Sequence, residues 1–210
     1  YMVNFLNNVL FTQWDGVTKE IVFLGDSVIR DYDLNRFFPD IKSKLFNCGV
    51  SGITTEGLFN IIKQGVIRHK PKTIVMLVGT NDMSEYYNKR DEEIIFNIAR
   101  VITELKIILK KVNIVLISIL PCDEARYGKD AIGGGRENSR IIEINKTLKE
   151  FENHFKDLTY VDVFKDLSDK SGNLINSYTH DGIHLTLKGY EKLTSALKPI
   201  IQKLLKKDED

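Results

Sequence analysis

The sequence predicts an α/β protein, built as a three-layer α/β/α sandwich around about five parallel strands. Unbroken apolar runs, which are typical of strands buried on both faces, alternate along the chain with segments of helical spacing. Parallel strands need long crossover connections, and the helical segments supply them. The predicted strands cover residues 21–24, 44–47, 74–78, 114–120 and 159–163.

Four segments with helical spacing lie between or after the predicted strands. The first covers residues 54–68 and begins with Thr54 or Thr55 as its N-cap. The other three each carry one apolar stripe, over residues 94–108, 141–155 and 190–204. A short helical extension is expected before the first strand, over residues 1–18. Because no repeat, low-complexity tract or linker interrupts the chain, we expect a single domain over residues 1–210.

The composition is that of an ordinary globular protein, with 42% apolar residues, 28% charged residues and a net charge of +1. Because positive and negative charges nearly balance, there is no electrostatic reason to expect binding to nucleic acid or to an anionic membrane. No apolar run approaches the ~20 residues of a membrane span, and the first residues do not resemble a signal peptide. We therefore expect a cytoplasmic protein without nucleic-acid partners or stable membrane association. Cys48 and Cys122 form no zinc or disulfide pattern and are predicted to be buried free thiols.

Small and polar residues follow the predicted strands. Ser27 comes after the first strand, Gly52 after the second and Asn81 after the third. Asp181 and His184 share a loop that follows the fifth strand and precedes the last predicted helix. Because ligands bind beyond the carboxyl ends of parallel strands, we expect these residues to meet at one edge of the sheet.

These residue types are the ones that acyl transfer from an ester requires. Ser27 supplies a nucleophilic hydroxyl, His184 a base, and Asp181 a carboxylate that can orient one ring nitrogen of the base. Donors for an oxyanion are available from the Gly52 amide, the Asn81 side chain and the Ser27 amide itself. The five residues together predict a hydrolytic site at the sheet edge.

Each assignment has an alternative. His180 is the nearest rival base, and Gly49 is a second glycine after the second strand. Asn81 can instead cap the helix that follows the third strand. Asp26 is interpreted as holding the turn rather than as a catalytic acid. Two further histidines are predicted to face solvent, His69 and His154.

The motif blocks resemble those of the SGNH (GDSL-type) hydrolase superfamily and occur in the order typical of that family. They read Gly25-Asp26-Ser27, Gly52, Gly79-Thr80-Asn81-Asp82 and Asp181-Gly182-Ile183-His184. Within the superfamily, "GTND" and "DGIHLTLKGY" are most similar to bacterial proteins resembling the catalytic subunit of platelet-activating-factor acetylhydrolase. The resemblance implies a flavodoxin-like SGNH hydrolase fold and a serine esterase that needs no cofactor and no metal. It also implies a triad of Ser27, Asp181 and His184, and an oxyanion hole of Ser27, Gly52 and Asn81.

The expected substrate is a small-molecule ester with a short acyl group, with acetyl favoured. A lysophospholipase or thioesterase-type acyl hydrolase is the alternative within the same family, and a homodimer stays open. An alternative from a different class is a receiver-like signalling module, built on Asp26, Asp82, Ser118 and Lys165. That hypothesis leaves the other strand-end residues unexplained. A flavin-binding module is weaker still, because the loop after the first strand lacks a Ser/Thr-Gly phosphate-binding run.

A long loop over residues 121–140 follows the fourth strand. Its three consecutive glycines, 133–135, lack the Gly-Lys-Ser/Thr signature of a phosphate loop, so we expect a flexible loop over the site. Its charged residues either contact substrate or are solvated loop charges. They are Asp123, Glu124, Arg126 and Arg136.

Overall fold

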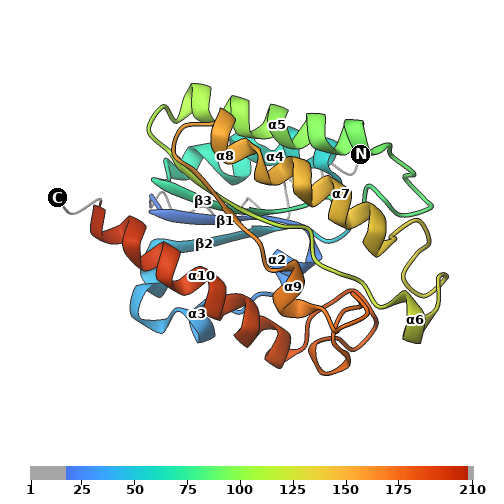
Figure 1. Cartoon of the computed structure of the whole chain (residues 1–210). Coiled ribbons are helices and arrows are strands. Elements are labelled where there is room, and N and C mark those ends of the chain that lie inside the picture. Colours follow the sequence, from blue (N-terminus) through green and yellow to red (C-terminus); the bar gives the residue numbers. More distant parts are fainter. Residues whose placement is uncertain (1–17, 208–210) are drawn as a thin grey trace.

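The computed structural model describes residues 18–207 and has a five-stranded, all-parallel sheet at its centre (Figure 1). The strand order is β2-β1-β3-β4-β5, which confirms the predicted α/β architecture. The strands are β1 (Ile21–Gly25), β2 (Leu45–Gly49), β3 (Thr73–Leu77), β4 (Asn113–Ile117) and β5 (Leu158–Val161). The predicted N-terminal helical extension over residues 1–18 lies, apart from residue 18, outside the described residues.

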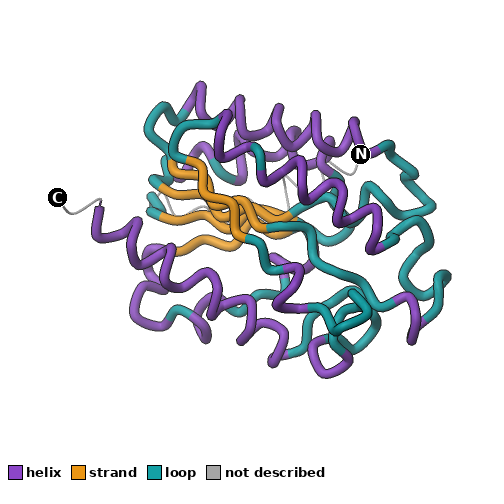
Figure 2. Tube along the Cα trace, in the orientation of Figure 1, coloured by secondary structure: helices purple, strands orange, loops and turns teal. Residues whose placement is uncertain are grey.

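Helices cover both faces of the sheet, which makes the three layers visible in Figures 1 and 2. One layer holds α4 (Thr55–Gly65), α5 (Asp91–Ile108), α7 (Asn138–Lys149) and α8 (Phe151–His154). The other holds α2 (Ser27–Arg30), α3 (Leu34–Phe37), α9 (Phe164–Leu167) and α10 (Leu187–Lys207). A short helix, α6 (Glu124–Tyr127), lies in the loop after β4. No helix among residues 18–207 is long and apolar enough to cross a membrane.

The strand side chains alternate between two apolar cores. In β1, Val22 and Leu24 pack with residues of α4, α5 and α7, whereas Ile21 and Phe23 pack with residues of α2, α3 and α10. All four side chains are buried. Because both faces of the sheet are covered, a central strand has no solvent-facing position, and this explains the unbroken apolar runs in the sequence.

Two predicted helices differ in extent from the observed ones. The helix expected over residues 54–68 ends at Gly65 and is followed by a 3₁₀ turn, Ile67–His69. The helix expected over residues 141–155 divides near Glu150 into α7 and α8. The N-cap is Thr54, whose hydroxyl accepts a hydrogen bond from the Gly57 amide at 3.2 Å.

The prediction that His69 faces solvent is wrong. Its side chain is only 1% exposed, and its ring centroid lies 4.1 Å from that of Phe46 on the edge strand β2. The polar neighbours of His69 gave no sign that the 3₁₀ turn folds back onto this strand. The exposure of His154 and the burial of the free thiols of Cys48 and Cys122 are as predicted.

The carboxyl ends of the three strands that carry the candidate residues finish level with one another. Gly25 at the end of β1 is opposite Gly49 in β2 and Leu77 in β3. The loops that follow these strands therefore emerge at the same edge of the sheet, where a site can form.

Candidate active site

Ser27 is the first residue of α2 and lies directly beyond the end of β1. Gly25 allows the turn, because a Cβ there would lie 2.0 Å from the Leu77 carbonyl oxygen. Asp26 caps the helix, with its Oδ1 accepting from the Val28 amide at 2.9 Å, as the sequence predicts. The turn holds Ser27 at the sheet edge, where its side chain is buried.

The loop that carries Asp181 and His184 is closed by an antiparallel bridge between Thr179 and Leu185. Asp181 Oδ1 accepts from the backbone amides of Ile183, at 3.0 Å, and His184, at 2.8 Å. Between them, Gly182 has a φ of +90°, a conformation that glycine adopts without strain. This tight turn places the Asp181 carboxylate beside the His184 ring.

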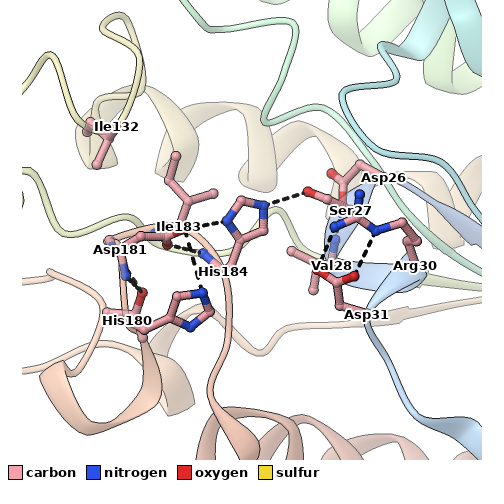
Figure 3. Close-up of polar contacts among 12 residues, drawn as sticks. Asp26, Ser27, Val28, Arg30, Asp31, Ile132, His180, Asp181, Ile183 and His184 are labelled. Carbon is pink, nitrogen blue, oxygen red and sulfur yellow. Dashed lines mark hydrogen bonds and ion pairs between the residues drawn. The ribbon is translucent and has the colours of Figure 1, made fainter.

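The loop and the turn after β1 bring three side chains into one hydrogen-bonded series (Figure 3). His184 Nε2 lies 2.8 Å from Ser27 Oγ, and His184 Nδ1 lies 2.6 Å from Asp181 Oδ2. A carboxylate only accepts, so the Nδ1 proton is donated to Asp181 and Nε2 is left to accept from the hydroxyl. This arrangement can take the hydroxyl proton while the oxygen attacks a carbonyl carbon.

Two carboxyl groups at the site have pKa values shifted in opposite directions. Burial alone would raise the pKa of Asp181, but the hydrogen bonds from the His184 ring and from the His184 and Ile183 amides lower the pKa overall. Complete burial raises the pKa of Asp26 to about 6, against the hydrogen bond from the Val28 amide. The hydrogen bonds from His184 and Ile183 therefore favour the ionised form of Asp181, which lies beside the histidine, whereas burial disfavours the ionised form of Asp26.

His180, the rival base, lies on a different side of Asp181. Its Nε2 is 3.8 Å from Asp181 Oδ2, and its side chain is 62% exposed. Figure 3 shows the His184 ring, and not the His180 ring, between Asp181 and Ser27. Only His184 is thus placed to exchange a proton with the hydroxyl.

The oxyanion donors named from the sequence lie on segments that follow β1, β2 and β3, whose carboxyl ends finish at the same edge of the sheet. Within residues 18–207, the backbone amides of Ser27 and Gly52 have no hydrogen-bond acceptor, whereas the Gly49 amide donates to Asn47 Oδ1 at 2.9 Å. Gly52, with a φ of +70°, is therefore the second-strand glycine with a free donor. Asn81 Nδ2 donates one of its two hydrogens to the Ile53 carbonyl at 3.0 Å, and its second hydrogen remains available as a donor. Asn81 does not cap α5, which begins only at Asp91.

The chain is similar to known proteins in both sequence and structure. The sequence model of the GDSL-like lipase/acylhydrolase family matches residues 23–192. The chain belongs to this family. Among the relatives of this acylhydrolase is the rat platelet-activating factor acetylhydrolase IB subunit alpha1, 22% identical over 90% of this chain and 78% of the relative.

Solved structures share the fold of the acylhydrolase. A structure from Streptococcus pneumoniae, named for platelet activating factor, has a TM-score of 0.81 and 29% identity, covering 95% of this chain and 89% of that one. A GDSL-like lipase from Bacteroides thetaiotaomicron has a TM-score of 0.80 and 23% identity, covering 97% and 99% of the two chains. The predicted superfamily and fold are confirmed.

The receiver-like alternative finds no support in this acylhydrolase. Asp82 is fully buried, and its carboxylate accepts from the Thr55 amide and hydroxyl. Ser118 Oγ accepts from the Val163 amide at 3.0 Å, and Asp26 caps α2. These side chains join backbone segments of the fold, and the chain belongs to a family of lipases and acylhydrolases.

One group of side chains in the acylhydrolase has the composition of a metal site. His180, Asp181 and His184 each offer a ligand atom, and these atoms lie within 4.8 Å of one another. Asp181 Oδ2 and His184 Nδ1 are already hydrogen-bonded to each other at 2.6 Å. A cation bound there would displace the hydrogen bond that orients the His184 ring.

The loop over residues 121–140 packs against the site of the acylhydrolase. A Cβ on Gly182 would lie 2.9 Å from the Ile132 side chain, and the Asp123 amide donates to the Gly182 carbonyl at 2.9 Å. The solvated alternative is wrong for Asp123, which is 1% exposed, and for Arg136, which is 7% exposed. Sequence reasoning missed their burial, although the glycines before Arg136 were a signal of close backbone approach.

Proposed function

We propose that the chain is a serine esterase in which Ser27 attacks the ester carbonyl and His184 accepts the hydroxyl proton. Asp181 orients the imidazole and stabilises the imidazolium that forms. The observation that carries the proposal is the continuous series of two short hydrogen bonds, 2.8 Å from Ser27 to His184 and 2.6 Å from His184 to Asp181. Groups at these distances are within reach for proton transfer.

The proposed reaction has two halves. The attack of Ser27 Oγ gives a tetrahedral intermediate whose oxyanion accepts from the Ser27 and Gly52 amides and from Asn81 Nδ2. The intermediate collapses when His184 gives its proton to the leaving alcohol, which leaves an acyl group on Ser27. A water molecule, deprotonated by His184, then attacks the acyl-enzyme and releases the acid.

We propose a short acyl group, with acetyl favoured, on a small-molecule alcohol. A cavity beside the site is lined by Val28, Thr80 and Ile183, the chain neighbours of Ser27, Asn81 and His184. This cavity is narrow, with space for little more than one water molecule, so it favours a small acyl group over a long chain. The rat relative is named an acetylhydrolase, which supports the same choice. Lysophospholipase or thioesterase activity is the alternative, for which a longer acyl chain would have to lie outside this cavity.

The acyl preference is tested with p-nitrophenyl esters from acetate to palmitate. We expect kcat/KM to fall by about 10–100-fold once the acyl chain outgrows the cavity, because overpacking costs roughly 1–3 kcal/mol. Replacing Ile183 with alanine enlarges the cavity and should move the optimum to a longer chain. A wild-type preference for long-chain esters would contradict the acetyl assignment and favour the lysophospholipase alternative.

The oxyanion role of Asn81 is tested by Asn81→Ala. We expect kcat to fall by about 10²–10³-fold with little change in KM, because the amide contacts the oxyanion only after attack. Steady-state kinetics with p-nitrophenyl acetate give both constants, and thermal unfolding checks that loss of the Ile53 contact leaves the fold intact. An unchanged kcat in a folded variant would remove Asn81 from the proposal.

A single domain over residues 1–210, a homodimer and a cytoplasmic location remain predictions of the sequence. Limited proteolysis would test the first, sedimentation equilibrium the second and cell fractionation the third.

A further inference from the structure

Arg136 places a buried guanidinium beside the oxyanion donors. Nε donates to Thr80 Oγ1 at 3.2 Å, Nη2 to Asn81 Oδ1 at 3.2 Å, and Nη1 to the Ile132 carbonyl. Within residues 18–207, no carboxylate lies within ion-pair distance of this side chain, although the buried Asp26 carboxyl interacts with it over a longer range. A buried cation whose hydrogen bonds go to neutral oxygens is costly, so its position calls for a reason.

The three glycines before Arg136 are the backbone device that delivers it. Gly133, Gly134 and Gly135 have φ values of +75°, +58° and +63°. A Cβ on Gly135 would lie 2.1 Å from the Met83 carbonyl oxygen, and the Gly133 carbonyl accepts from the Glu85 amide at 2.9 Å. The run therefore wraps the turn that follows Asn81, which ties Arg136 to the same motif. A side chain at Gly135 would separate the two segments.

The contacts of the Asn81 amide select one of its two orientations. A guanidinium only donates, so it requires the Asn81 oxygen, and the Ile53 carbonyl only accepts, so it requires the Asn81 nitrogen. The reversed amide would satisfy neither partner and would offer its oxygen where an oxyanion must bind. Arg136 thus favours the orientation that leaves an N–H free for the oxyanion.

We propose that Arg136 is a positioning residue of the oxyanion hole, which fixes the Asn81 amide as a donor and adds positive charge beside the developing oxyanion. The turn formed by Gly133, Gly134 and Gly135 positions the Arg136 side chain next to Asn81. The inference rests on the proposed function, because it requires Asn81 to act on the oxyanion. It gives the loop over residues 121–140 a role in transition-state stabilisation and not in substrate contact.

The test is a double-mutant cycle of Arg136→Met and Asn81→Ala, with kcat and KM measured for p-nitrophenyl acetate. We expect Arg136→Met to lower kcat by about 10–100-fold with KM nearly unchanged. In the Asn81→Ala background the same change should cost less than about threefold, because its main target is gone. Arg136→Lys keeps the charge and a donating group but loses the planar fork that reaches three acceptors, so it should recover part of kcat. The matched control is Lys129→Met, which removes an exposed charge from the same loop, where Lys129 lies 3.9 Å from the exposed Glu137, and should leave kcat unchanged.

The outcomes of these measurements separate this inference from the proposed function. A folded Arg136→Met variant with wild-type kcat overturns the positioning role, as does an equal loss in both backgrounds. If Arg136→Met does not fold, the same cycle with Arg136→Gln, which removes the charge and keeps a polar side chain, decides: wild-type kcat, or an equal loss in both backgrounds, overturns the inference. If Ser27→Ala retains wild-type activity, the proposed function itself fails, whatever Arg136 does.

Discussion

Replacing Ser27 with alanine is expected to lower kcat for p-nitrophenyl acetate by about 10⁴-fold or more. The substitution removes the hydroxyl that lies 2.8 Å from His184 Nε2 and leaves a small side chain in a buried position. The acyl-enzyme then has no oxygen on which to form, while the oxyanion donors and the fold persist. Initial rates, compared with the uncatalysed reaction, measure the loss.

Covalent labelling gives an independent measure of the same prediction. A fluorophosphonate probe should label Ser27 in the wild-type protein and should not label the Ser27→Ala variant. Ser51→Ala is the matched control, because it removes an exposed hydroxyl from the neighbouring loop beside Gly52. Labelling of another residue, or wild-type rates in Ser27→Ala, would contradict the assignment. Mg²⁺-dependent transfer of the phosphoryl group of acetyl phosphate to Asp82, with release of acetate, would instead point to the receiver hypothesis.

Asp181→Asn is expected to lower kcat by about 10³–10⁴-fold. The asparagine oxygen can still accept from the Ile183 and His184 amides, so the turn should persist. Its amide nitrogen, however, would donate to His184 Nδ1 and move the ring proton to Nε2. Nε2 could then no longer accept the proton of Ser27. Steady-state kinetics and the rate of fluorophosphonate inactivation should fall together.

The control for Asp181→Asn is Asp31→Asn. Asp31 is another carboxylate near Ser27, where it pairs with Arg30 at 2.7 Å on the surface. Its loss should change kcat by less than about threefold, because exposed ion pairs contribute little. If Asp181→Asn lowered kcat no more than Asp31→Asn did, neither the charge of Asp181 nor its hydrogen bond to the ring would contribute to catalysis, and Asp181 would leave the proposal.

The apolar pattern predicted the strands better than it predicted their ends. The fourth strand was expected to run to residue 120, whereas β4 ends at Ile117. Ile119 and Leu120 are as buried as strand residues, but they line the cavity beside the site after the chain has left the sheet. Burial makes a run apolar whether or not its backbone pairs with a neighbouring strand, so periodicity cannot mark this boundary.

Polar residues buried by distant segments were the main failure of sequence reasoning. His69 and Arg136 both stand among polar neighbours, which is the usual sign of an exposed turn. Arg136 is covered because its loop folds against a turn 55 positions earlier, where it meets Asn81. His69 is covered because its turn returns to β2. The glycines before Arg136 are a local sign of close backbone approach, but they do not show which segment is approached, and the sequence around His69 carries no such sign.

The sequence by itself determined the fold class, the family and the residue types at the strand ends, because periodicity and turn chemistry are local properties of the chain. Only the tertiary structure decided which of those residues touch. Ser27 and His184 are 157 positions apart, yet the sheet edge brings them within 2.8 Å. The tertiary structure also determines that the Gly52 amide has no acceptor among the described residues, and that the Arg136 side chain contacts Asn81. These contacts depend on how distant segments pack, and the packing is set by the two cores as a whole.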